Sequence, residues 1–151
     1  MKRESGIVRI LVAADGSESA NRAVELAAKL TKALDGQLKI IHVINRDSFS
    51  ADELNEYSIR EHVTSGEVLT TFAQQELAAA RQRAEALGAS DIQLESPFGD
   101  VAESILDSAR QHKADLIILG KRGRGRVTGL LLGSTSQKVA ASASCAVTVV
   151  P

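Results

Sequence analysis

A glycine-rich, basic segment in the last third of the chain has the composition of a phosphate-binding loop. Five of the eleven glycines fall between positions 120 and 133, directly after an apolar run. Glycine lets a backbone turn at positive φ and approach a ligand closely, and the segment ends at Gly133-Ser134-Thr135, where a helical pattern begins. Every charged residue after Asp115 is positive, namely Lys121, Arg122, Arg124, Arg126 and Lys138. The sequence therefore predicts an anion site.

The alternative for this segment is a flexible surface loop. Flexibility explains the glycines, but it explains neither the lack of acidic residues nor the helix start that closes the segment. Because cations attract phosphate, we expect Arg122 and Arg124 to strengthen binding in a salt-dependent way.

A second candidate follows the first apolar run of the chain, in Ala13-Ala14-Asp15-Gly16-Ser17. An aspartate at the end of a first strand can accept hydrogen bonds from ribose hydroxyls. An aspartate before Gly-Ser more often forms a turn or caps a helix. Taken alone, Asp15 leaves both interpretations open.

Other chemistries lack the residues they need. The chain has no Gly-x4-Gly-Lys-Ser/Thr loop and no Gly-x-Ser-x-Gly elbow, and His42, His62 and His112 are not spaced as metal ligands. The single cysteine, Cys145, excludes an internal disulfide and indicates a reducing compartment. The arginine-glycine tract 122–126 is short and has no aromatic residue nearby, which argues against nucleic-acid binding. We therefore expect neither a catalytic triad nor a metal site built by the protein itself.

Length and composition predict a single cytoplasmic domain over residues 1–151. A chain of 151 residues is long enough for one well-buried core, and 25% charged residues with 44% hydrophobic residues is ordinary for a globular protein. The formal net charge of -1 argues against coating nucleic acid or adhering to anionic membranes. The first residues form neither a signal peptide nor a membrane span, and the apolar runs elsewhere are too short to cross a bilayer.

Short apolar runs alternate with longer amphipathic patterns, which is typical of βα units. We expect buried strands at 7–14, 38–44, 92–95, 116–119 and 146–150. Helices are expected at 17–34, 69–87, from 100 onward, and from Ser134 through 141, where Ser134 and Gln137 resemble a capping box. The stretch 45–66 reads as a loop with a short helix.

Five strands joined through helices predict an α/β fold: an open parallel sheet covered on both faces. Ligands bind such sheets beyond the carboxyl ends of the strands, where the strand order reverses. Residues 13–17 and the segment from Gly120 onward both follow strands at that edge, so the two candidate segments are expected to converge.

The spacing Gly120-x2-Gly123-x9-Gly133-Ser134 resembles that of the ATP-binding branch of the universal stress protein family. The resemblance covers nearly the whole chain, and further similar stretches are Ile10-Leu-Val-Ala-Ala-Asp-Gly-Ser17, Ile41-His-Val43, Gly99-Asp-Val-Ala-Glu-Ser-Ile105 and Cys145-Ala-Val-Thr-Val-Val150. It implies a Rossmann-like fold of the adenine nucleotide alpha hydrolase type, with sheet order 3-2-1-4-5. It also implies a homodimer paired through strand 146–150.

The resemblance assigns roles to individual positions. It implies that Asp15 binds the ribose with Ala13 and Ala14 beside it, and that the Val43 backbone meets adenine. Leu119 and Gly120 would line the nucleoside. The phosphates, bridged by Mg²⁺, would be held by Gly123, Gly133, Ser134 and Thr135. Family members often carry a proline near Ala13, and Thr-His or Ser-His in place of Lys121-Arg122.

Two functions from different classes follow. The first is a stress-response regulatory protein that binds ATP, or ADP or AMP in its place, and changes its dimer state or its docking to a protein partner such as a membrane transporter. The second is a slow ATP hydrolase or phosphoryl-transfer enzyme at the same cleft. Phosphoryl transfer normally needs positioned metal ligands, and the Gly120 segment offers cations but no carboxylate, so we expect binding without catalysis.

Overall fold

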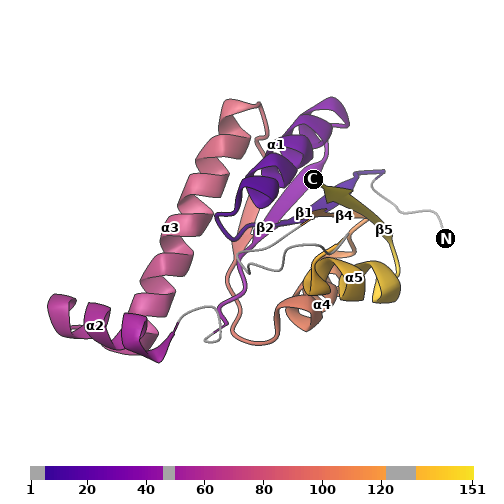
Figure 1. Cartoon of the computed structure of the whole chain (residues 1–151). Coiled ribbons are helices and arrows are strands. Elements are labelled where there is room, and N and C mark those ends of the chain that lie inside the picture. The colour runs from indigo at the N-terminus through magenta and orange to yellow at the C-terminus, as the bar shows by residue number, and fades with distance from the viewer. Residues whose placement is uncertain (1–5, 46–49, 122–131) are drawn as a thin grey trace.

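The structure is a computed structural model that describes residues 6–45, 50–121 and 132–151. Within these ranges strands and helices alternate along most of the chain (Figure 1). The elements are β1 (Arg9–Ala13), α1 (Glu18–Ala33), β2 (Gln37–Ile41), α2 (Ala51–Glu61), α3 (Ser65–Ala86), β3 (Ile92–Glu95), α4 (Val101–His112), β4 (Leu116–Gly120), α5 (Ser134–Ser142) and β5 (Ala146–Val150).

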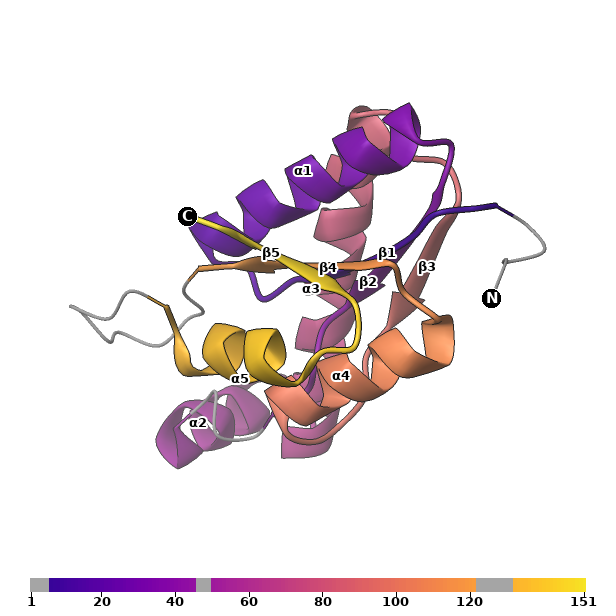
Figure 2. The same cartoon turned by 90° about the vertical axis from the view of Figure 1, so that its right-hand side faces the viewer.

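The strands form one sheet that is parallel throughout, in the order β3-β2-β1-β4-β5. This confirms the expected fold class and strand order. Figure 2 shows the sheet nearly edge-on, with α1 above it and α4 and α5 below, while α3 lies beside α1 (Figure 1). The order reverses between β1 and β4, so the carboxyl ends of these two strands flank the switch point where such sheets bind ligands.

The central strand β1 is buried on both faces, as a helix-covered parallel sheet requires. Ile10, Leu11 and Val12 have no exposed surface. Ile10 and Val12 belong to the core beneath α1 and α3, whereas Leu11 belongs to the core against α4 and α5. Alternation of side chains along one strand therefore joins two separate cores.

Two helices start at caps that the apolar pattern does not reveal. Helix α3 begins at Ser65 rather than 69, since the Thr64 side chain accepts a hydrogen bond from the Glu67 N–H and Glu67 returns one to the Thr64 backbone. The same reciprocal box, formed by Ser50 and Glu53, starts the eleven-residue α2. The stretch expected to be mostly loop is thus mostly helical.

Strand β2 ends at Ile41, three residues before the expected limit. The Ala14 N–H donates to the Ile41 carbonyl (2.9 Å), and the chain after β1 then turns away toward α1. Beyond Ile41 the backbone hydrogen bonds of this segment go to the β3 side, from the His42 N–H to Glu95 and from the Ile44 N–H to Pro97, and Ile44 forms an isolated bridge to Phe98. Val43 consequently lies just past the sheet, at its carboxyl edge.

Candidate functional site

The loop after β1 is held in one conformation by local hydrogen bonds. The Ser17 N–H donates to Oδ1 of Asp15 (2.9 Å), and the Ser17 hydroxyl accepts from the Ala20 N–H (3.2 Å) and caps α1. Gly16 takes φ +81°, a conformation that L side chains rarely adopt. Asp15 therefore does form the turn that sequence reasoning weighed as an alternative, and its carboxylate is fixed at the end of β1. Its ribose role stays a prediction.

A buried histidine joins the ends of β1 and β2. His42 is 8% exposed, and its Nδ1 donates to the Ala14 carbonyl at 2.7 Å, since a carbonyl oxygen only accepts. The His42 ring also meets Phe72 of α3 edge to face, with ring centroids 5.8 Å apart. Ala13 and Ile41 are partners in the β1–β2 ladder. This places Ala13, Ala14, Asp15 and Val43 at one edge of the sheet.

The end of β4 packs tightly against the first turn of α1. Leu119 is buried, and a Cβ placed on Gly120 would stand 2.5 Å from the Ser19 hydroxyl oxygen and 2.6 Å from the Ala20 nitrogen. No side chain fits there, because backbone of α1 fills the space. Glycine at this position therefore serves the close approach of strand and helix, whether or not a nucleoside also contacts it.

The two ends of the glycine-rich segment are tied together. The Lys121 N–H donates to the Val150 carbonyl (2.6 Å), and the Gly133 N–H donates to the Lys121 carbonyl (2.9 Å). The hydroxyl of Ser136 donates to the Gly120 carbonyl at 2.9 Å. The segment thus leaves and returns at one point beside β4. Arg122, Gly123 and Arg124 lie outside the described residues, so their assigned roles stay predictions.

The N-terminus of α5 differs from the sequence expectation. Gly133, not Ser134, is the N-cap residue, and no side chain among the described residues caps the helix. Gln137 does not complete a capping box, because its side-chain amide donates to the Leu132 carbonyl instead (2.9 Å). The predicted capping box was therefore wrong. Helix α5 therefore begins without a side-chain cap from the described residues, next to the hydroxyls of Ser134 and Thr135, and such an end favours an anion.

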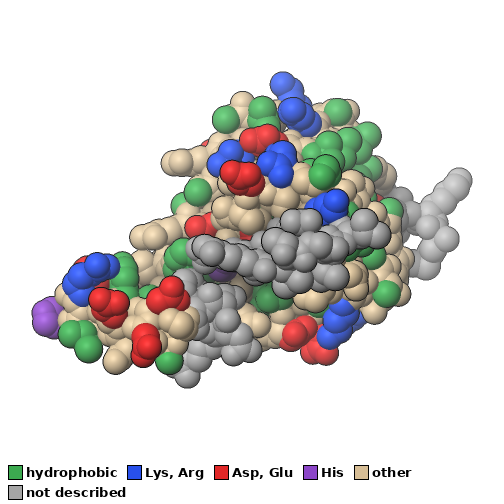
Figure 3. All heavy atoms as spheres, in the orientation of Figure 1, with side chains coloured by type: hydrophobic (Ala, Val, Ile, Leu, Met, Phe, Trp, Pro, Cys, Tyr) green, Lys and Arg blue, Asp and Glu red, His purple; other side chains and the backbone are tan. Residues whose placement is uncertain are grey.

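The sequence around α5 carries only positive charges, but acidic residues of α4 lie close to it in the structure. Lys138 lies 3.7 Å from Asp100 and 3.5 Å from Glu103, both at the start of α4. These pairs are exposed and weak, but they draw Lys138 toward α4. Figure 3 likewise shows acidic and basic side chains intermixed over this face of the molecule. Of the cations expected to attract phosphate, Lys121 is the one that remains at the described end of β4.

Most predicted site residues do converge. Ala13, Ala14, Asp15 and Val43 follow β1 and β2, whereas Leu119, Gly120, Gly133, Ser134 and Thr135 follow β4 or start α5, all at the carboxyl edge of the sheet. Within the described ranges no three His, Cys, Asp or Glu residues group as metal ligands. Sequence reasoning missed Glu76 of α3, whose carboxylate lies against Gly16. No local spacing could have found it, because sixty residues separate it from the loop.

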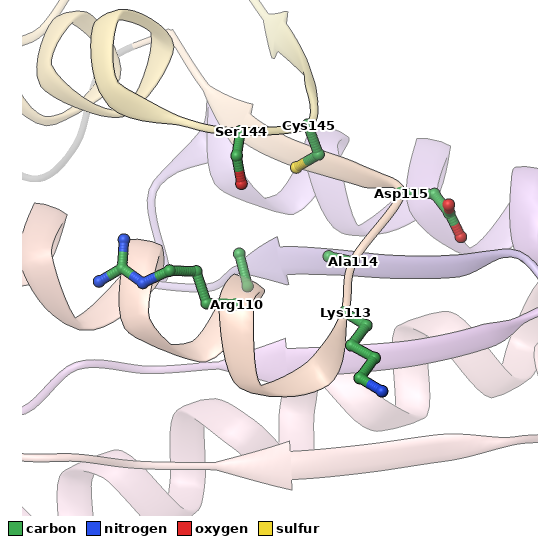
Figure 4. Close-up of a pocket in the computed structure, with 7 residues that line it drawn as sticks. Arg110, Lys113, Ala114, Asp115, Ser144 and Cys145 are labelled. Atoms are coloured by element: carbon green, nitrogen blue, oxygen red, sulfur yellow. The ribbon is translucent and has the colours of Figure 1, made fainter. Parts of the chain in front are cut away.

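One pocket defined by the described residues lies at the opposite edge of the sheet. It has a volume of about 430 Å³ and is lined by the end of α4 and by the residues just before β4 and β5 (Figure 4). Ser144 and Cys145 point toward this space, while the long side chains of Arg110 and Lys113 extend away from it (Figure 4). It is not part of the candidate site, since ligands on this fold bind at the carboxyl edge.

The groups with shifted pKa values form a polar cluster between α4 and strands β1 to β3. Burial raises the pKa of Glu95, but hydrogen bonds from Lys39 (2.7 Å) and Ser108 (2.6 Å) outweigh burial and hold the pKa below 4.5. Burial lowers the pKa of His112 below 6.5, and the positive charges of Lys39 and Arg9 lower it further against the opposing pull of Glu95 and Asp91. The buried Nε2 of His112 has no hydrogen-bond partner among the described residues.

This cluster predicts that stability falls in mild acid. As the pH falls through 6.5, the unfolded chain takes up a proton that native His112 resists, so the free energy of unfolding decreases until the pH passes below the native pKa. Urea denaturation between about pH 7.5 and 5.5 measures this slope. His112→Gln is expected to flatten it. His62→Asn, at the exposed left-handed end of α2 and outside the cluster, is the matched control for removing a histidine. Equal slopes in the parent and His112→Gln would contradict the assignment.

The chain is similar in sequence to a known protein family. The family model described as "Universal stress protein family" matches residues 7–151. The chain belongs to the universal stress protein family. A Thermus aquaticus protein named "Universal stress protein in QAH/OAS sulfhydrylase 3'region" is 34% identical over 145 residues, which cover 93% of this chain and 96% of that protein.

Solved structures of family members share the fold. The universal stress protein UspA from Lactobacillus plantarum superposes with a TM-score of 0.77 at 26% identity, covering 98% of this chain and 100% of its own. A universal stress protein solved in complex with cAMP gives a TM-score of 0.71 at 27% identity, with 97% and 98% covered. Among the described residues no helix is long and apolar enough to cross a membrane.

Proposed function

We propose that this universal stress protein binds ATP, or ADP or AMP in its place, as a cytoplasmic regulator in the stress response. The observation that carries the proposal is the N-terminus of α5, which starts after Gly133 with no side-chain cap from the described residues and is tied by the Gly133–Lys121 hydrogen bond to the end of β4. Free N–H groups at a helix start, at the switch point of a parallel sheet, suit a phosphate. The cAMP complex of a 27% identical relative supports an adenine nucleotide as the ligand.

The ligand would lie along the carboxyl edge of the sheet. Its phosphates would take the N–H groups of α5 and the hydroxyls of Ser134 and Thr135, with Lys121 adding positive charge. The ribose and adenine would lie toward Asp15 and Val43. A Mg²⁺ ion would neutralise the phosphate oxygens. The backbone around Asp15 is already fixed by its bond to Ser17, so little ordering is needed on binding.

We propose binding rather than turnover. Asp15 is the carboxylate placed at this edge by the motif, and one of its oxygens is engaged by the Ser17 N–H. The phosphate end offers N–H groups and hydroxyls, which hold an anion but do not deprotonate water. Phosphate release measured per bound ATP separates the two functions. Release slower than nucleotide exchange supports a binding module, and repeated rapid turnover supports the enzyme.

The ligand is expected to raise thermal stability. Anything that binds only the native state stabilises it by mass action, by about 2.7 kcal/mol at a hundredfold excess over Kd. For a domain of this size that corresponds to roughly 5 to 10 °C in Tm. A thermal melt with and without Mg-ATP measures the shift, and Mg-GTP tests selectivity for adenine. An unchanged Tm at millimolar Mg-ATP would contradict the proposal.

The second part of the proposal is a homodimer that pairs β5 with its copy. β5 lies at one edge of the sheet, in front in Figure 2, and its valines are half-buried in the monomer. The Val150 carbonyl accepts from Lys121, so the backbones of alternate residues Val147 and Val149 face away from β4. Such an apolar edge aggregates unless it is covered, and two-fold pairing closes it. Because Lys121 bonds to β5, a nucleotide beside Lys121 can alter this dimer or the docking of a partner, which we propose is a membrane transporter or another regulated protein.

A further inference from the structure

Helix α3 brings a carboxylate to the loop after β1 that no part of the glycine motif contains. A Cβ placed on Gly16 would stand 2.6 Å from Oε2 of Glu76 and 3.1 Å from Oε1. The carboxylate therefore occupies the space that a side chain at position 16 would need. One turn earlier, Phe72 contacts His42, which in turn binds the Ala14 carbonyl. Two successive turns of α3 thus face the segment that carries Asp15.

Glu76 is half-buried and has neither a hydrogen bond nor an ion pair within the described residues. Its neighbour in the loop is Gly16, which has no side chain to offer a donor. A carboxylate that loses water without gaining donors is costly. The N-terminus of α1 lies nearby and favours a negative charge, but Ser17 already caps this helix end. A ligand with hydroxyl donors would complete the site.

We propose that Glu76 recognises the ribose of the bound nucleotide. It would accept a hydrogen bond from one ribose hydroxyl while Asp15 accepts one from the other. This inference rests on the proposed function and adds a specificity residue to it. The two carboxylates also set the direction of the ligand. They repel phosphate from the β1 loop, whereas Lys121 and the α5 N-terminus attract it at the other end of the cleft.

Calorimetric titration with ATP, 2′-deoxy-ATP and 3′-deoxy-ATP tests the proposal. A hydrogen bond to a charged group is worth about tenfold or more in affinity, so the parent should bind each deoxy analogue at least about tenfold more weakly than ATP. In Glu76→Ala, ATP should bind about tenfold more weakly, and discrimination against one of the two analogues should vanish while the other is kept by Asp15. Glu85→Ala, an exposed carboxylate on the same helix, is the matched control.

The outcomes separate the inference from the function on which it rests. If the parent binds ATP and Glu76→Ala retains the parent's discrimination against both analogues, Glu76 has only a structural role and the inference is overturned. If the parent binds no adenine nucleotide, the proposed function fails first. Should Glu76→Ala not fold, Glu76→Gln keeps the shape and removes the charge. It should then weaken discrimination against the same single analogue, and unchanged ratios would again overturn the inference.

Discussion

Replacing Gly133 by valine is expected to lower ATP affinity by roughly tenfold to a hundredfold while the fold is retained. The backbone of Gly133 has φ -65° and ψ 160°, values that any residue adopts, so valine brings no conformational strain. Glycine is not needed there for its backbone freedom. A side chain would instead stand at the start of α5, where the phosphates are expected, and forcing atoms into filled space costs about 1–3 kcal/mol. Titration with Mg-ATP measures the loss.

A second glycine-to-valine change provides the control. Gly66 lies in the first turn of α3, and a Cβ there would have only the Thr64 hydroxyl within 4 Å, at 3.9 Å. Gly66→Val should therefore bind ATP as the parent does. Circular dichroism and urea denaturation establish that both variants fold. ATP binding by Gly133→Val at parental affinity would show that the phosphates lie elsewhere.

Replacing Val149 by proline is expected to convert the proposed dimer into a monomer. The Val149 N–H faces away from β4, so its removal leaves the β4–β5 ladder intact but deletes a donor from the edge that would pair with the second copy. Proline at an edge strand is also how natural sheets block pairing. Light scattering behind a sizing column should give twice the 16.0 kDa chain mass for the parent and a single chain mass for Val149→Pro.

Proline at the adjacent position 148 distinguishes an effect on the free edge of β5 from an effect on the β4–β5 pairing. The Thr148 backbone faces β4, so Thr148→Pro should break the ladder and destabilise the monomer as well. Val149→Pro should instead keep the parental circular dichroism spectrum. A parent chain that runs as a monomer at micromolar concentration would refute the dimer, and a Val149→Pro chain that remains dimeric would place the interface elsewhere.

The fold could be predicted because its signals are local and repeated. The apolar runs that become β1 and β4 are short and buried on both faces, and their alternation with helices leaves few possible topologies. The edge strand β3 was found with its correct limits at Ile92–Glu95. The strand order, by contrast, came from the family resemblance rather than from the periodicity.

The misses at the helix starts concern hydrogen bonds between side chains and the backbone, which the apolar pattern does not record. The Thr64 and Glu67 pair lies outside the apolar pattern of α3, so the pattern alone started the helix too late. At α5 the pair Ser134 and Gln137 had the spacing of a box, but Gln137 reaches the Leu132 carbonyl instead. No side chain of the described residues caps this helix start, and the departure from the local rule falls at the expected phosphate site.

The sequence proposes site residues only where they are contiguous with a motif. Asp15 and the segment from Gly120 to Thr135 are such candidates, because each follows a strand that ends at the switch point, and their roles stay predictions. Glu76 could not be predicted, since the packing of α3 against α1 brings it to Gly16. A residue that a neighbouring helix brings to the site has no motif around it in the sequence. Its proximity to the site follows only from the packing of the helices in the structure.

Calorimetric titration of the full chain with Mg-ATP is the most direct measurement of the central claim, which is that the α5 N-terminus and the loop after β1 form one nucleotide site. The parent should bind about one ATP per chain, with GTP binding much more weakly, and Gly133→Val should bind ATP roughly tenfold to a hundredfold more weakly while Gly66→Val keeps the parental affinity. No heat from millimolar Mg-ATP, in a parent chain that is folded and shows no change in Tm, would contradict the account.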